Sequence, residues 1–212
     1  MLACLMDARL YAPATQRNRE PILAVLRRVL PPTGAVLEIA SGTGEHAVWL
    51  AAQLPGLVFQ PSDPQPAQRA SIAAWIAASG PINLRTPLAL DATTADWEAH
   101  AEIPPGLAAI LCINMIHIAP WNAALGLVRG AGVALGAGGL LYLYGPYRRG
   151  GRHTAASNEA FDRSLRAQNP EWGVRDLETL AAVADAAGLA LEEVVEMPAN
   201  NLSLILRRRV AT

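Results

Sequence analysis

The 212-residue chain is 52% hydrophobic and 17% charged, which suits one domain with a substantial core and excludes intrinsic disorder. The formal net charge of −1 excludes a general field that attracts nucleic acid. The apolar stretch 1–6 is too short to span a bilayer and no other window is long enough, so we expect a cytoplasmic protein.

The first half of the chain alternates between helical and extended patterns. A proline in a first turn followed by one apolar face predicts a helix over residues 21–30, which Pro31 and Pro32 end. Pro87 marks the third expected strand as an edge or bulged strand. The expected elements are strands over residues 35–40, 57–60 and 84–90, and helices over residues 44–54 and 65–78.

The second half continues the alternation and ends differently. We expect strands over residues 107–113 and 138–144, with a helix over residues 121–135 between them. Residues 145–175, rich in Gly, Arg and Asn, read as an insert with one helix. A helix over 176–187 and a hairpin, made of strands 189–196 and 202–208, complete the chain.

Strands that alternate with helices predict a parallel sheet covered by helices on both faces. The expected fold is therefore a Rossmann-like three-layer α/β/α sandwich. Its seven-stranded sheet is mostly parallel and carries an antiparallel C-terminal hairpin strand. In such sheets, ligands bind beyond the carboxyl ends of the strands.

The turn after the first strand carries the main ligand-binding signal. It reads Glu38-Ile-Ala-Ser-Gly-Thr-Gly44, and its glycines allow a tight turn and close approach of a ligand to the backbone. The next helix begins there with unpaired N–H groups. Glu38, just before the turn, can meet a cationic or hydroxyl-bearing ligand.

Two acidic residues follow the next two strands. Asp63 suits the position, about 20 residues beyond a glycine loop, at which nucleotide-binding folds place a ribose acceptor. Asp63 also suits an N-cap, because Pro64 and a helical stretch follow it. Asp91 can accept from an adenine amine or cap the segment that leads to Trp97.

Polar residues also follow the most apolar strand, in Asn114-Met-Ile-His117. His117 is a candidate catalytic base, although a histidine between two isoleucines also suits a packed core position. The loop residues Gly42 to Ala47 fit a relaxed dinucleotide fingerprint as well, so an NAD(P)-type oxidoreductase is a competing interpretation. Glu38 counts against it, because a carboxylate repels a pyrophosphate.

Together these motifs resemble the seven-stranded (class I) S-adenosylmethionine-dependent methyltransferases, whose first motif is acidic-x-Gly-x-Gly-x-Gly. Ala40 stands here in place of the first glycine. The resemblance implies S-adenosylmethionine as cofactor, Asp63 as ribose acceptor and Asp91 as adenine acceptor. The full set of cofactor-binding residues that we expect is Asn18, Glu38, Ala40, Ser41, Gly42, Gly44, Asp63, Pro64, Asp91, Ala92, Asn114, Met115 and Ile116.

A closer resemblance, over nearly the whole chain, is to a group of methyltransferase-like proteins known mainly as a domain of unknown function, the methyltransferase-like protein 26 group. Five segments show this resemblance: Tyr11-Ala-Pro-Ala-Thr-Gln-Arg-Asn18, Tyr144-Gly-Pro-Tyr147, Ser157-Asn-Glu-Ala-Phe-Asp162, Asn169-Pro-Glu-Trp-Gly-Val-Arg-Asp176 and Met197-Pro-Ala-Asn-Asn201. This resemblance implies the fold and the cofactor, and it implies no methyl acceptor.

We expect the acceptor, a small molecule, to meet the irregular segments. Tyr11, Arg17 and Asn18 are expected in a lid formed by residues 1–19, and Tyr147, Asn158 and Asn200 on the opposite wall. Tyr11 and Tyr147 are further catalytic candidates. Neither Cys4 nor Cys112 belongs to a metal-ligand spacing, so no metal is expected. A protein that binds S-adenosylmethionine without turnover is the remaining alternative.

Overall fold

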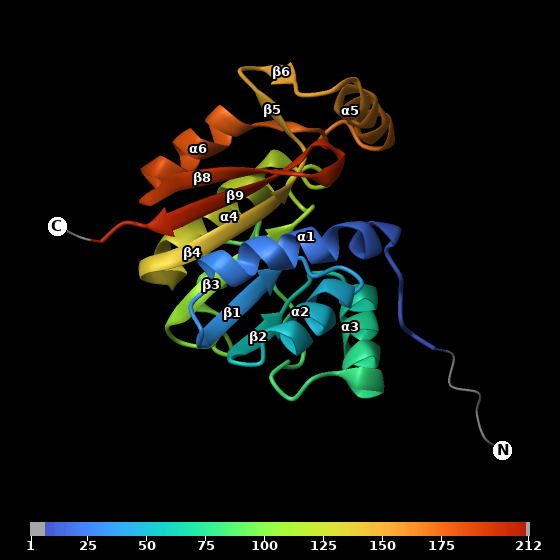
Figure 1. The fold of residues 1–212 in the computed structure, drawn as a ribbon, viewed down its shortest axis with the longest axis vertical. Coiled ribbons are helices and arrows are strands. Elements are labelled where there is room, and N and C mark those ends of the chain that lie inside the picture. Colours follow the sequence, from blue (N-terminus) through green and yellow to red (C-terminus); the bar gives the residue numbers. More distant parts are fainter. Residues whose placement is uncertain (1–6, 211–212) are drawn as a thin grey trace.

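The computed structural model describes residues 7–210, in which one main sheet forms the centre of the molecule (Figure 1). Its strands are hydrogen-bonded in the order β2-β1-β3-β4-β9-β8. Neighbouring strands from β2 to β4 run parallel, and β9 is antiparallel to both β4 and β8. The strands are β1 (Gly34–Ile39), β2 (Leu57–Pro61), β3 (Leu107–Ile113), β4 (Leu135–Gly145), β8 (Leu189–Met197) and β9 (Asn201–Arg208).

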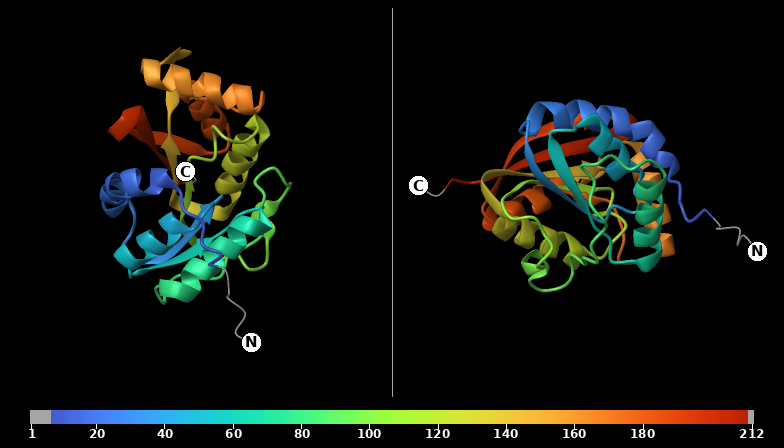
Figure 2. Two further views of the ribbon diagram at one scale, coloured as in Figure 1. Left: turned by 90° about the vertical axis from the view of Figure 1, so that its right-hand side faces the viewer. Right: turned by 90° about the horizontal axis from the view of Figure 1, so that it is seen from below.

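Helices cover both faces of this sheet, as the two further views in Figure 2 show. The helices are α1 (Pro13–Val29), α2 (Glu45–Gln53), α3 (Pro66–Ser79), α4 (Trp121–Ala134), α5 (Ala156–Gln168) and α6 (Leu177–Ala186). Buried side chains of α1 and α2 pack in one apolar cluster and those of α4 and α6 in another. The mostly parallel α/β/α architecture expected from the sequence is confirmed.

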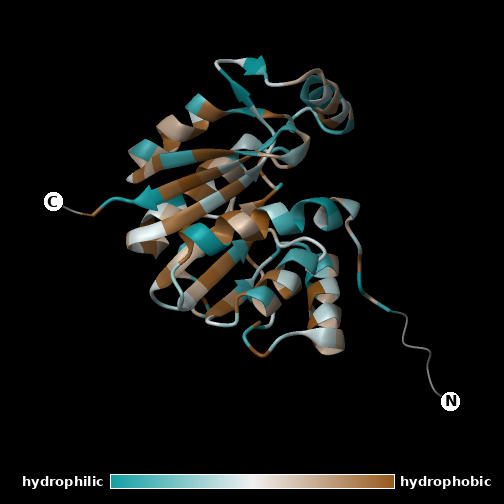
Figure 3. Cartoon of the chain, viewed as in Figure 1, coloured by the Kyte–Doolittle hydropathy of each residue, from teal (hydrophilic) through white to brown (hydrophobic). Residues whose placement is uncertain are grey.

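The central strands are mostly apolar because each face of the sheet is covered. In β1, Val36 packs in the cluster of α1 and α2, whereas its neighbour Leu37 packs in the cluster of α4 and α6. Both side chains are fully buried. Figure 3 shows this as hydrophobic colour along the inner strands and mixed colour along the outer helices.

The expected strand over residues 84–90 is an interrupted edge, and this corrects the count of seven strands. The segment lies beside β2 through two isolated parallel bridges, Phe59 with Leu84 and Ser62 with Leu88. Between them stands Pro87, which has no N–H to donate. The main sheet of residues 7–210 therefore has six strands. The segment expected to be the seventh strand pairs with β2 only through these two isolated bridges.

The first helix begins at Pro13, well before the expected start at residue 21. Pro13 occupies its first turn, and Pro21 lies inside the helix. The early turns were missed because their buried side chains, Thr15 and Asn18, are polar and add nothing to an apolar pattern. This extension carries the N-terminal end of α1 toward the carboxyl edge of the sheet (Figure 1).

The insert between β4 and α6 contains α5, as expected, and also a small sheet of three strands within the described residues. These are β5 (Tyr147–Arg149), β6 (Arg152–His153) and β7 (Arg175–Asp176), too short to leave a sequence pattern. Asp176 caps α6 by accepting from the Thr179 N–H at 3.2 Å. No helix in residues 7–210 is both long enough and apolar enough to cross a bilayer.

Candidate functional site

The carboxyl ends of the four parallel strands bring the predicted residues to one edge of the sheet. The glycine loop follows β1, Asp63 follows β2, Asn114 follows β3 and Gly145 ends β4. The chain moves from β1 to β2 on one side and from β3 to β4 on the other, so strand order reverses between β1 and β3. Such a reversal opens a crevice in which α/β proteins bind ligands.

The glycine loop is a run of left-handed backbone conformations. Ala40, Gly42 and Gly44 have φ angles of 56°, 57° and 90°. Gly44 is required for a second reason, because a Cβ there would lie 2.9 Å from Cγ1 of Ile72 on α3. Ala40 thus adopts a glycine-like conformation at the position where the methyltransferase motif has glycine.

Glu38, near the end of β1 and just before this loop, is unusual for a carboxylate because it is buried and one of its oxygens is unpartnered. Its side chain is 3% exposed, and its Oε2 has no hydrogen-bond partner among residues 7–210. Burial raises the pKa of Glu38 from 4.5 to about 7, against a hydrogen bond from Ser41 that lowers it, and the charge of Asp63 raises it further. A buried, unpaired acceptor of this kind is costly unless a ligand satisfies it.

Asp63 supports the loop directly. Its Oδ2 accepts from the Gly42 N–H at 3.0 Å, and its Oδ1 accepts from the Gln65 N–H at 2.9 Å. Burial raises the pKa of Asp63, although both hydrogen bonds oppose that shift. The N-cap residue of α3 is Gln65 and it has no side-chain cap, so Asp63 closes the turn before the helix and the N-cap interpretation is wrong. Pro64, which follows it, is exposed, and its carbonyl accepts from Arg69 at 2.7 Å.

Protein acceptors already occupy much of the loop's hydrogen-bonding capacity. The Ser41 N–H donates to the Ser62 carbonyl at 2.8 Å, and the Gly44 N–H donates to the Ser41 carbonyl at 3.1 Å. Glu45, in the first turn of α2, is 7% exposed and places its carboxylate at the positive end of that helix. The protein's own carboxylates, Glu45 and Asp63, thus take positions that a bound phosphate would need.

Asp91 lies on the surface near the same edge. Its Oδ1 accepts from both the N–H and the hydroxyl of Thr93, at 2.8 and 2.7 Å, and so stabilises the turn that leads toward Trp97. The N-cap residue of the short helix at Trp97 is Asp96. Ala92 beside it is buried, and its carbonyl packs against Gly126 of α4.

The segment after β3 mixes one left-handed polar residue with buried side chains. Asn114 has a φ of 66°, and its N–H donates to the Tyr144 carbonyl at 2.9 Å. Met115 and Ile116 are buried in the core cluster of α4 and α6. These two residues therefore contribute their backbone and the packing of their side chains to this edge of the sheet.

His117 is 5% exposed, and its ring meets Phe161 of α5 edge to face at 5.5 Å. Burial lowers the pKa of His117 from 6.5 to about 4, and the charge of Arg175 lowers it further. The imidazole is consequently neutral at pH 7.

Asn18 is satisfied by neighbouring side chains, which changes its expected role. Its Oδ1 lies 2.8 Å from Nε2 of His46 on α2, and it also hydrogen-bonds the Tyr144 hydroxyl at the end of β4. Burial lowers the pKa of His46 to about 4. Asn18 therefore joins three elements around the site. No local sequence pattern predicts His46 or Tyr144 as partners of Asn18, because these residues are close to it only in space.

The structure brings together two of the three residues expected on the wall opposite the lid, Asn158 and Asn200. Asn158 of α5 donates through Nδ2 to the Asn200 carbonyl at 2.8 Å, and Asn200 donates to the Ser157 hydroxyl at 3.1 Å. Tyr147 does not join them. Its side chain is 1% exposed and packs in the core, so its expected place on an open wall is corrected.

The N-terminal side is more open. Tyr11 is 60% exposed and Arg17 is also exposed, near the start of α1. Residues 1–6 of the expected lid, with Cys4, lie outside the described residues. Cys112 is buried as a free thiol, and residues 7–210 contain no cluster of His, Cys, Asp or Glu arranged for a metal ion.

Comparison with known families covers almost the whole chain. Residues 9–208 match a family described as "Protein of unknown function (DUF938)". The chain belongs to this family.

Several solved structures similar to this DUF938 chain are described as methyltransferases. An O-methyltransferase family protein from Burkholderia thailandensis is 18% identical, with a TM-score of 0.78 over 94% of this chain and 58% of that one. The mitomycin 7-O-methyltransferase MmcR is 16% identical, with a TM-score of 0.75 over 92% and 54%. Human N-acetylserotonin methyltransferase, solved with S-adenosylmethionine, is 13% identical, with a TM-score of 0.75 over 93% and 53%.

These similarities establish that the DUF938 chain has the fold of class I methyltransferases. The chain spans little more than half the length of each of these structures.

Proposed function

We propose that the chain is an S-adenosylmethionine-dependent methyltransferase that acts on a small molecule. The observation that carries this proposal is Glu38, a buried carboxylate with an unpartnered oxygen on the strand that leads into a left-handed glycine loop. A ligand with a cationic or hydroxyl group can satisfy that oxygen, and S-adenosylmethionine has both. The methyltransferase fold and the donor present in the human neighbour support the same cofactor.

The same geometry argues against a dinucleotide. The Gly42 N–H is already bonded to Asp63, and the Glu45 carboxylate stands at the start of α2. A pyrophosphate would meet negative charge at each of these positions. The oxidoreductase interpretation therefore becomes unfavourable.

The candidate residues of the strand ends have distinct roles in the proposed site. Glu38 accepts from the donor's hydroxyl or ammonium groups, Asp63 supports the loop and faces the ribose, and Asp91 offers its second oxygen to the adenine amine. Ala40, Ser41, Gly42 and Gly44 contribute backbone, as do Pro64 and Ala92, while Asn114, Met115 and Ile116 border the crevice. The cofactor supplies the activated methyl group, and the chain supplies orientation.

The acceptor side is formed by the N-terminal segment and the insert. Within a single domain, we propose residues 1–19 as a lid that presents Tyr11 and Arg17, and residues 145–175 as a substrate-side insert that presents Asn158 with Asn200.

His117 is neutral at pH 7 and is therefore in the right state to accept a proton. The shared segments also place the chain, in our proposal, with the methyltransferase-like protein 26 group.

A second candidate is a protein that binds the donor without transferring the methyl group. The burial of both His117 and Tyr147 favours it, because neither side chain is open to an acceptor. The two candidates share the cofactor and differ only in turnover.

A transfer assay tests the proposed function. The full chain is incubated with donor carrying an isotope-labelled methyl group and with small-molecule fractions of a cell extract, and products are read by mass spectrometry. We expect a labelled small molecule that depends on the chain and is lost with Asp63→Ala. Donor binding with no labelled product in any fraction would favour the second candidate.

A further inference from the structure

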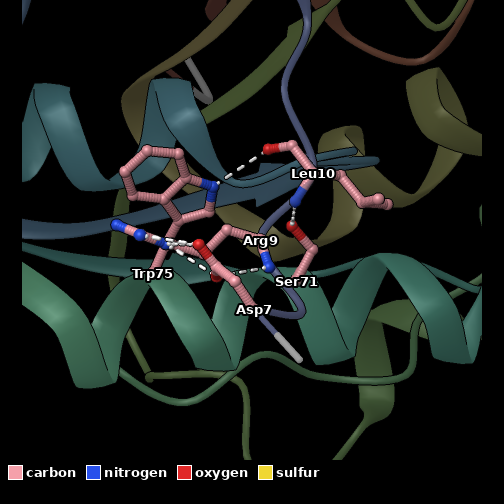
Figure 4. Close-up of polar contacts among 5 residues, drawn as sticks. All are labelled: Asp7, Arg9, Leu10, Ser71 and Trp75. Atoms are coloured by element: carbon pink, nitrogen blue, oxygen red, sulfur yellow. Dashed lines mark hydrogen bonds and ion pairs between the residues drawn. The ribbon is translucent and has the colours of Figure 1, made fainter. Parts of the chain in front are cut away.

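Residues 7–12, here called the N-terminal strap, lie beside α3, where Leu10 is close to Ser71 and Trp75 (Figure 4). Trp75 of α3 donates through Nε1 to the Leu10 carbonyl at 3.1 Å. The Arg9 guanidinium lies 4.9 Å from the centre of the Trp75 ring, and Asp7 holds that guanidinium in place. The Tyr11 ring meets Trp75 edge to face at 5.1 Å. The strap is therefore docked by several specific contacts.

One hydroxyl joins the strap to the glycine loop. Ser71 of α3 is fully buried, and its Oγ accepts from the Leu10 N–H at 2.8 Å. The same hydroxyl donates to the Thr43 carbonyl at 2.7 Å. Because a serine hydroxyl has one proton, its two bonds have fixed directions, from Leu10 through Ser71 to Thr43.

A second connection reaches the same loop residue. The Glu45 carboxylate accepts from the Ala12 N–H and, at 3.2 Å, from the Thr43 hydroxyl. Thr43 lies between Gly42 and Gly44, the two left-handed glycines of the loop. Both bridges from the strap thus end on the residue between those glycines.

We propose that Ser71 and Glu45 are positioning residues that couple the docking of the strap to the shape of the glycine loop. This inference rests on the proposed function for its consequence, since the loop is the proposed donor site. Donor binding orders the loop and so strengthens docking of the strap. By linkage, a docked strap must strengthen donor binding by the same factor.

The first test needs no ligand. Amide hydrogen exchange is measured in the full chain for the wild type, for Ser71→Ala, and for Ser79→Ala as an exposed control on the same helix. Ser71→Ala should speed exchange at Leu10 and also at Gly44 in the loop, whereas Ser79→Ala should change neither. Faster exchange at Leu10 with unchanged exchange at Gly44 would overturn the coupling.

The second test uses S-adenosylhomocysteine as the probe. Calorimetry should show about 5- to 10-fold weaker binding for Ser71→Ala, within the usual range of coupling between sites. Glu45→Gln, which keeps one acceptor, should weaken binding less. The probe should also slow exchange at Leu10 in the wild type, which a merely structural serine would not explain.

Equal affinity of wild type and Ser71→Ala, with no protection of Leu10, would contradict the inference. A wild-type chain that does not bind the probe at all would contradict the proposed function instead. In that case, the ligand-free exchange at Gly44 still decides whether the strap and the loop are coupled.

Discussion

At the scale of single residues, the buried carboxylate of Glu38 destabilises the folded chain when no ligand is bound. Its carboxylate is removed from water, and one oxygen has no partner in the described chain. Folded proteins retain such groups mainly where a function needs them. Stability and ligand binding should therefore respond in opposite directions to changes at this position.

The pH dependence of Glu38→Gln tests this view. Because the folded pKa of Glu38 is raised from 4.5 to about 7, the folded state holds the proton more tightly, and stability falls as pH rises through that window. Above pH 7 the wild type bears the full cost of burying an ionised Glu38 carboxylate. At pH 8 the variant should therefore be more stable than the wild type by on the order of 3 kcal/mol. At pH 4 the gain should vanish. Thermal unfolding at both pH values measures it, and no gain at pH 8 would refute the burial argument.

Some residue roles follow from sequence position and others do not. Glu38 and Asp63 follow strands, so the sequence places them at the ligand-binding edge. Asn18 and Tyr147 were expected to face ligands, but neighbouring side chains satisfy the first and bury the second. Those neighbours are distant in sequence, and no local pattern reports them.

At the scale of elements, the turn from β1 to α2 determines the shape of the proposed site. Ala40 holds a left-handed conformation that costs a non-glycine residue about 1–2 kcal/mol. The sequence identified the missing glycine of the motif, and the structure shows that the backbone conformation is kept without it.

Ala40→Gly should therefore stabilise the chain. Relief of the left-handed strain, less the added freedom of the unfolded chain, leaves a gain of about 1 kcal/mol. The control is Ala77→Gly, at an exposed position inside α3, where the same change should destabilise by about 1 kcal/mol. Denaturant unfolding compares the two, and a loss of stability in both would show that Ala40 is not strained.

Element boundaries were predictable where apolar periodicity continues to the end of the element. The strands β1 and β3 and the helices α2, α3 and α4 were placed within a residue or two. The start of α1 was missed because its buried face begins with polar residues, and the edge strand failed at Pro87. The strands of the insert are too short to have a period.

At the scale of the whole molecule, strand order explains why the candidate residues converge. The reversal between β1 and β3 separates the loops that follow them, and the candidate residues follow four strands at the same carboxyl edge of the sheet. The strap packs against α3, and the insert follows the carboxyl end of β4. The alternation of helices and strands was sufficient to predict this architecture, whereas the contacts between strap and loop depend on α3 being packed beside the loop.

The central claim is that the crevice binds a methyl donor and not a dinucleotide. Isothermal titration of the full chain with S-adenosylhomocysteine and with NAD, side by side, tests it most directly. We expect binding of the first only, weakened about 10- to 150-fold by Glu38→Ala or Asp63→Ala through loss of a charge-assisted hydrogen bond. Tighter binding of NAD, or full retention of S-adenosylhomocysteine affinity in both variants, would contradict the claim.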